Sequence, residues 1–114
     1  MDESSVAAYV RVFNKSVRWK QFSDLNATDF AVLLALILRT QPGNVVYTYS
    51  SIREEIGAEL VIHQRTVYRA VLRLTASRFL YKIKTNKYLL SPSISWLGNE
   101  KERLRLIQEL NEAK

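Results

Sequence analysis

The sequence predicts a single α+β domain that is mainly helical and carries one small β-hairpin. Apolar residues recur at helical spacing in several segments, and a later segment alternates as β-strands do on either side of a turn. With 114 residues, of which 47% are hydrophobic, the chain can build one core. We expect residues 1–114 to form one domain, with an N-terminal segment over 1–25, a core over 26–91 and a C-terminal helix over 99–113.

The first elements are expected before residue 50. Residues 6–13 are rich in β-branched and aromatic types and form either a short strand or the start of a helix. Asn26 is placed to cap a helix over 30–38, and the lack of a polar face in that helix predicts burial nearly all round. The sequence Pro-Gly-Asn at 42–44 ends this helix, and the β-rich segment 45–49 is a short strand.

A second helix is predicted to begin at Ser51, because Ser51 and Glu54 have the spacing of a capping box. Gly57 is placed to end or bend it. Its apolar residues fall on one helical line, which consists of Ile52, Ile56 and Leu60.

The third helix, predicted over 64–77, is the most informative segment. Its inward line consists of Val67, Val71 and Leu74, with Ala70 beside them. Its other faces carry the long hydrogen-bonding side chains of Gln64, Arg65, Tyr68, Arg69 and Arg73. A helix that lies in a DNA major groove has this organisation, because its first turns reach base edges while its back packs on the domain.

A β-hairpin is predicted after this helix. Residues 80–84 and 87–91 form its strands, with the turn at or near Asn86. The alternation places Lys82 and Lys84 on one face.

Pro92 ends the strand pairing, and Asn99 is placed to cap a last helix over 100–113. One line of this helix carries Leu104 and Ile107, which need burial. We therefore expect a homodimer that forms through the N-terminal segment and the last helix.

The excess of positive charge comes from one stretch of the chain. Residues 61–90 hold seven basic residues and no acid, whereas the rest of the chain holds 10 basic and 11 acidic residues. Such clustering is typical of a surface that meets a polyanion, because neutralising phosphates releases counterions. A solvated helix face followed by a basic hairpin is the simpler alternative.

Several classes of protein are excluded or disfavoured by composition. Without Cys there is no disulfide, thiolate nucleophile or Cys-based metal site, and His63 has no second His as a partner ligand. No glycine-rich phosphate-binding loop occurs, so we expect neither catalysis nor a cofactor nor a metal. The chain begins without a secretory signal, and its longest apolar run, 30–38, is too short to cross a bilayer. We expect a soluble, cytoplasmic protein with no membrane partner.

The predicted order of helix, strand, helix, turn, helix and hairpin is that of a winged helix-turn-helix. The helix over 64–77 would enter the major groove. The hairpin would be the wing, which can lay Lys82, Lys84 or Lys87 against an adjacent groove or phosphates.

Residues 62–69, Ile-His-Gln-Arg-Thr-Val-Tyr-Arg, followed by Leu74 and Phe79-Leu80, resemble the recognition-helix pattern of bacterial winged-helix proteins, MarR-like regulators among them.

The segment 87–98, Lys-Tyr-Leu-Leu-Ser-Pro-Ser-Ile-Ser-Trp-Leu-Gly, resembles the end of the RepL family of plasmid replication proteins. That family has Asn where this chain has Ser91 and Lys where it has Leu97. The resemblance implies replication or copy maintenance of a plasmid or similar element, with the replication machinery as a possible partner.

The candidate DNA-binding residues come from both helices and the hairpin. They are Thr48, Ser50, His63, Gln64, Arg65, Thr66, Tyr68, Arg69, Arg73, Lys82, Lys84, Asn86 and Lys87. Each has a structural alternative: the arginines as solvated side chains, Thr66 and Tyr68 as packing residues, and His63 and Ser50 as helix caps. The aromatic residues are expected in the core, with base stacking as the alternative; they are Trp19, Tyr47, Tyr49 and Trp96.

These observations favour sequence-specific binding of double-stranded DNA. Replication or maintenance of a mobile element is the first expected role, and transcriptional repression is the alternative. A protein-interaction module, whose basic stretch meets an acidic partner, remains a third possibility.

Overall fold

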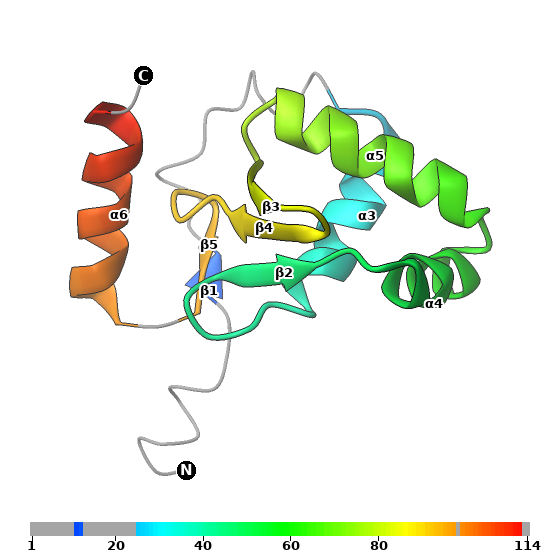
Figure 1. Ribbon diagram of the computed structural model, residues 1–114, viewed down its shortest axis with the longest axis horizontal. Helices are drawn as coiled ribbons and strands as arrows, with labels where there is room; N and C mark the ends of the chain where they lie inside the picture. Colours follow the sequence, from blue (N-terminus) through cyan, green and yellow to red (C-terminus); the bar gives the residue numbers. More distant parts are fainter. Residues whose placement is uncertain (1–10, 13–24, 98, 113–114) are drawn as a thin grey trace, which may run out of the picture.

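The computed structural model describes residues 11–12, 25–97 and 99–112, and these form an α+β fold (Figure 1). The described part contains four helices: α3 (Ala27–Ile37), α4 (Ser50–Leu60), α5 (Gln64–Ala76) and α6 (Glu100–Glu112). None of them is long and apolar enough to cross a membrane. The expected α+β class is confirmed.

The described strands form two antiparallel sheets. Strands β2 (Val45–Tyr47), β4 (Lys87–Leu90) and β3 (Leu80–Lys84) make a three-stranded sheet in the order β2–β4–β3. The short strands β1 (Arg11–Val12) and β5 (Ser95–Trp96) pair separately. The predicted hairpin is confirmed, and within the ambiguous segment 6–13 the described residues are the two of strand β1.

Helix α3 is capped as expected, since the side-chain oxygen of Asn26 accepts the N–H of Asp29 at 2.7 Å. Its expected burial on all sides is wrong, because Leu34 is half exposed and Leu38, which caps the C-terminus, is 83% exposed. The helix contacts the core along one side only. It ends at Ile37, before the turn at 42–44, which instead leads into β2.

Helix α4 starts at Ser50 without a side-chain cap, so the capping box predicted at Ser51 is wrong. Gly57 lies inside the helix and does not end it. A Cβ atom at Gly57 would lie 2.6 Å from the carbonyl oxygen of Ile62, so the close approach of the following turn requires glycine there. The helix ends at Leu60, and its C-cap residue Val61 adopts the left-handed conformation with φ 56°.

Helix α5 matches the prediction within one residue. His63 caps it, and the predicted inward line is buried: Val67, Ala70, Val71 and Leu74. These side chains pack into one core with residues of α3 and α4, with Phe79 just before β3, and with one face of the sheet that includes Leu90.

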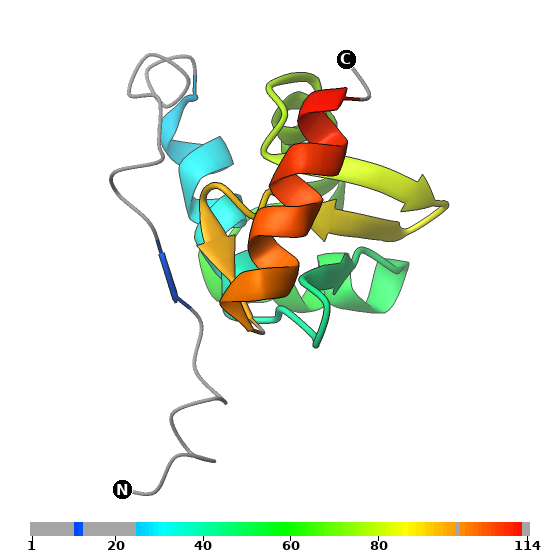
Figure 2. The same ribbon diagram turned by 90° about the vertical axis from the view of Figure 1, so that its left-hand side faces the viewer.

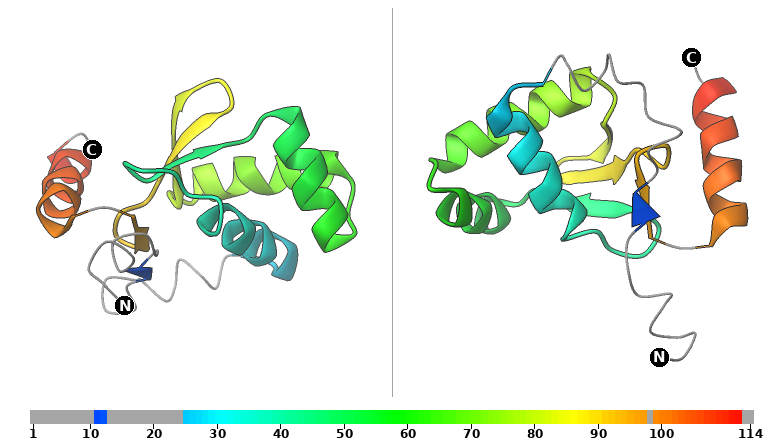
Figure 3. Two further views of the ribbon diagram at one scale, coloured as in Figure 1. Left: turned by 90° about the horizontal axis from the view of Figure 1, so that it is seen from below. Right: turned by 180° about the vertical axis from the view of Figure 1, so that it is seen from behind.

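The hairpin projects from the helical body (Figures 2 and 3). Its strands contain an irregularity, since Lys82 pairs with Tyr88 while Lys84 pairs with Lys87. Cross-strand partners share a face, and neighbouring residues of a strand point to opposite faces. Because Tyr88 and Lys87 are neighbours, Lys82 and Lys84 lie on opposite faces. The expectation that both lysines share one face is therefore wrong, and a bulge at Ile83 is the reason.

Helix α6 stands at the opposite end of the molecule from α4 (Figure 1). The side-chain oxygen of Asn99 accepts the N–H of Glu102 at 2.8 Å, which confirms the predicted cap. Buried Arg103 donates its Nε–H to the carbonyl oxygen of Pro92 at 2.8 Å and so ties α6 to the segment after β4. The N-terminal segment expected at a dimer contact lies outside the described residues except for 11–12 and Leu25.

Candidate nucleic-acid interface

The exposed face of α5 carries the side chains predicted to contact DNA. Arg65, Tyr68 and Arg69 are exposed, and Tyr68 and Arg69 lie three and four residues after Arg65, about one helical turn further along the same side. They lie in the N-terminal half of α5, away from the buried line that begins at Val67. Gln64 and Thr66 are partly buried beside them.

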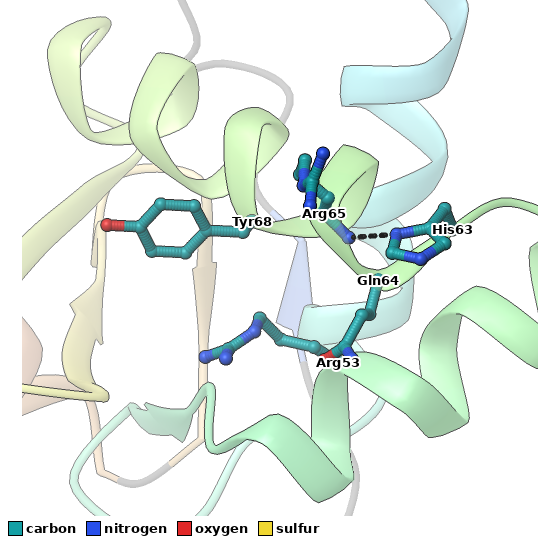
Figure 4. A pocket seen from close by; sticks show the side chains of 5 residues that line it. All are labelled: Arg53, His63, Gln64, Arg65 and Tyr68. Atoms are coloured by element: carbon teal, nitrogen blue, oxygen red, sulfur yellow. Dashed lines mark hydrogen bonds between the residues drawn. The ribbon is translucent and has the colours of Figure 1, made fainter.

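An open hollow of about 270 Å³ lies between α4 and the start of α5 (Figure 4). It is lined by Arg53, His63, Gln64, Arg65 and Tyr68. The imidazole Nδ1 of His63 accepts the backbone N–H of Arg65 at 3.0 Å, so this histidine orders the first turn of α5. His63 therefore acts as a helix cap, which is the role the sequence offered as the alternative to DNA contact.

Arg53 joins four parts of this region, although no sequence pattern indicated a role for it. Its guanidinium carbon lies 5.4 Å from the ring centroid of Tyr68. One guanidinium nitrogen donates to the carbonyl oxygen of Thr48 at 2.6 Å and to the side-chain oxygen of Asn86 at 3.3 Å. Arg53 thereby connects α4, the end of β2, the hairpin turn and α5.

The hairpin turn is also tied through the backbone. The N–H of Thr48 donates to the carbonyl oxygen of Asn86 at 2.9 Å. Asn86 adopts φ 61°, a left-handed conformation that asparagine tolerates better than most residues. Asn86 and Arg53 together fix the position of the hairpin tip relative to α4.

Two predicted DNA contacts therefore have internal partners. Thr48 is only 3% exposed, which withdraws its hydroxyl from the surface. The side chain of Asn86 is engaged by Arg53. Ser50, by contrast, is exposed at the first residue of α4.

Arg73 also has an internal partner. Its Nε–H donates to both carboxylate oxygens of Asp29, at 2.8 and 2.9 Å, and a second guanidinium nitrogen lies 2.6 Å from the same carboxylate. These hydrogen bonds raise the pKa of Arg73, and burial opposes them in part. Asp29 is 1% exposed, so this pair joins α3 to α5 at the edge of the core.

The three lysines of the hairpin divide between the two faces of the sheet. Lys82 shares a face with Tyr88, which is buried on the core side where α5 packs. Burial raises the pKa of Tyr88, the neighbouring Tyr68 adds to this rise, and Arg53 opposes it. Lys84 and Lys87 lie on the outer face of the sheet.

Apart from Arg73, the basic residues of α5 and the hairpin have no acidic partner within the described residues. Five cations there form no ion pair: Arg65, Arg69, Lys82, Lys84 and Lys87. Two glutamates of α4, Glu55 and Glu59, both bind Arg39 instead. The result is a basic surface around the N-terminal half of α5 and the hairpin.

In residues 11–12, 25–97 and 99–112 no group of three or more His, Cys, Asp or Glu side chains is arranged to hold a metal ion. Of the aromatic residues expected in the core, Tyr49 is instead 46% exposed. Trp19 and the side chain of Trp96 lie outside the described part. Comparisons with protein-family models, curated proteins and solved structures find no match to this chain.

Proposed function

We propose that the chain binds double-stranded DNA as a winged helix-turn-helix protein, with α5 in the major groove and the β3–β4 hairpin as the wing. The order of elements from α3 to β4 and the strand order β2–β4–β3 support this arrangement. The observation that carries the proposal is the pair Arg65 and Arg69. Both are exposed on the half of α5 opposite its buried line, and neither has an acidic partner in the described residues.

The dimensions and chemistry of this face suit a groove. An α-helix with its side chains is about 10–12 Å wide, and the major groove of B-DNA is about 12 Å wide. Arg65 and Arg69 are one turn apart, and arginine can donate two hydrogen bonds to one guanine. Lys82, on the sheet face nearer α5, is placed for a phosphate.

The biological role is proposed from the sequence resemblance and from this surface together. Replication or maintenance of a mobile element is the first role, and repression of transcription is the second, since both need the same DNA-binding surface. The position of the bound site, at an origin or over a promoter, distinguishes them.

A second copy of the chain is the proposed partner of α6. Leu104 is 55% exposed, and Ile107 on the same line is half-buried, so this face gains burial from a second helix. Sedimentation should detect a dimer at tens of micromolar, and monomer alone at that concentration would overturn this part of the proposal.

Selection from a random duplex pool tests DNA binding directly. We expect an enriched sequence that binds about a thousandfold more tightly than scrambled DNA, with an affinity that falls steeply with salt. Absence of enrichment, together with weak and salt-insensitive binding, would contradict the proposal and favour the interaction module.

The variant Arg69→Ala tests whether the exposed face of α5 is the DNA-binding surface. Loss of a base contact of arginine costs about 1–3 kcal/mol, so we expect the affinity for the selected duplex to fall at least about tenfold. Arg105→Ala, at an exposed position of α6 that does not belong to the line of Leu104 and Ile107, removes the same side chain and is the matched control. Equal affinities of the two variants would remove α5 from the interface.

A further inference from the structure

Two tyrosine rings stack at the end of β2. The centroids of Tyr47 and Tyr49 are 5.6 Å apart and the ring planes differ by 9°. Tyr47 is partly buried, whereas Tyr49 is 46% exposed. The pair is therefore a flat aromatic stack that opens to solvent at Tyr49.

Two lysines extend this stack across the sheet. Strand register pairs Tyr47 with Lys87, and Lys87 with Lys84. Cross-strand partners share a face, and adjacent strands are about 4.8 Å apart, so these three residues form a row roughly 10 Å long. The bulge at Ile83 brings Lys84 into this row. We call Tyr47, Tyr49, Lys84 and Lys87 the tyrosine–lysine row.

The tyrosine–lysine row lies on the outer face of the sheet. Val46, Tyr88 and Leu90 fill the opposite face and are buried against the helices. Arg65 and Arg69 belong to α5, which packs on that core side. The row is thus a separate basic surface, and strands β2, β3 and β4 contain no acidic residue to oppose its charge.

We propose that the tyrosine–lysine row binds single-stranded nucleic acid, with a base stacked on Tyr49 and the adjoining phosphates near Lys84 and Lys87. An aromatic platform beside cations holds unpaired nucleotides because every base has a π-face and every linkage a phosphate. In a duplex the neighbouring base pairs cover those faces. The two lysines disfavour a cationic ligand on the same rings. This site does not require α5 to bind duplex DNA.

Fluorescence anisotropy with the full chain tests the proposal. The probes are labelled oligothymidine and oligouridine of about twenty nucleotides, long enough to cover one site, and a mixed-sequence duplex of equal length. We expect the wild-type protein to bind a single strand at low salt. Tyr49→Leu should weaken that binding about tenfold, in line with loss of one stacked base. Tyr49→Phe, which keeps the ring, should retain it.

Two further variants separate this site from the duplex-binding face. Lys84→Ala should lower the slope of log affinity against log salt by about 0.7, the value for one phosphate contact on a single strand. Arg69→Ala should weaken duplex binding and leave single-strand binding unchanged. A preference for oligothymidine or for oligouridine supports the proposal and identifies the natural strand as DNA or RNA.

Three results would overturn the single-strand site. They are no binding of either oligonucleotide by the wild-type protein, equal affinity of Tyr49→Leu and wild type, and a single-strand affinity that depends on Arg69 but not on Tyr49. Circular dichroism of each variant checks folding, and Lys84→Ala, an exposed position, tests the site even if Tyr49→Leu fails to fold. Because the duplex is measured beside the single strands, failure of one proposal is distinguishable from failure of the other.

Discussion

Arg69 and Arg73 lie one turn apart on α5 and have opposite surroundings. Arg73 binds both carboxylate oxygens of Asp29, which helix α3 brings to the edge of the core. Arg69 is exposed and forms no ion pair in the part of the chain that the structure describes. The role of a basic residue on this helix therefore depends on whether another element brings an acid beside it.

The same contrast holds between two regions of the molecule. On one side, Arg39 and Arg73 are paired with acids of α4 and α3. On the other side, the N-terminal half of α5 and the hairpin keep their cations unpaired in the described residues. Because these acids are neutralised by internal partners, they repel an external polyanion less. The positive potential of the basic surface is stronger as a result.

The largest expected effect is on folding, from Arg73→Ala. Removing the guanidinium leaves the buried carboxylate of Asp29 uncompensated, and because Arg73 itself is half exposed we expect a loss of about 3 kcal/mol in the free energy of unfolding. Urea denaturation of Arg73→Ala and Arg69→Ala gives a matched comparison, with the second variant within about 0.5 kcal/mol of wild type. Equal urea midpoints for the two variants would show that the ion pair of Arg73 contributes no more to stability than the unpaired side chain of Arg69.

An intermediate effect is expected from Arg53→Met, which keeps the apolar stem but removes the hydrogen bonds to Thr48 and Asn86. The Thr48 amide hydrogen bonds to the carbonyl oxygen of Asn86, so its exchange rate reports on the connection between β2 and the hairpin turn. If the lost bonds contribute about 1 kcal/mol, this hydrogen should exchange about fivefold to tenfold faster than in the wild-type protein. Amide hydrogens in the middle of α3 should exchange at the wild-type rate. Unchanged exchange at Thr48 would show that Arg53 does not hold the hairpin.

The smallest expected effect is from Arg39→Ala. Its partners Glu55 and Glu59 are more than half exposed, and exposed ion pairs contribute about 0.2–1 kcal/mol each. We expect thermal unfolding to shift by a few degrees at most. The two freed carboxylates should also weaken duplex binding slightly at low salt but not at high salt. A loss of stability as large as that of Arg73→Ala would show that the exposure of the carboxylates does not explain the difference between the Arg39 and Arg73 ion pairs.

Local sequence signals predicted the helix starts and the hairpin well. Asn26, His63 and Asn99 cap helices as expected, because a cap needs only a side chain and the backbone two or three residues away. The inward line of α5 was also predictable, since its spacing repeats with the helical period. The capping box failed because α4 begins one residue earlier, at Ser50, where Tyr49 holds the cap position.

The candidate site was predictable only in part. Exposure of Arg65, Tyr68 and Arg69 followed from the helical pattern of α5. The internal partners of Thr48, Asn86 and Arg73 did not, because each lies on a different element. No local pattern could have indicated Arg53, whose contacts reach residues up to 33 positions away.

Local sequence was enough to predict the three capped helices α3, α5 and α6, the hairpin, the inward line of α5 and the concentration of positive charge between residues 61 and 90. These properties depend on neighbours in the chain and on composition. The folded structure was needed to show which cations stay unpaired among the described residues, which face of the sheet each lysine occupies, and that Tyr49 opens to solvent. Those properties arise from contacts between distant segments and from a bulge at Ile83, which reverses the side-chain alternation beyond it.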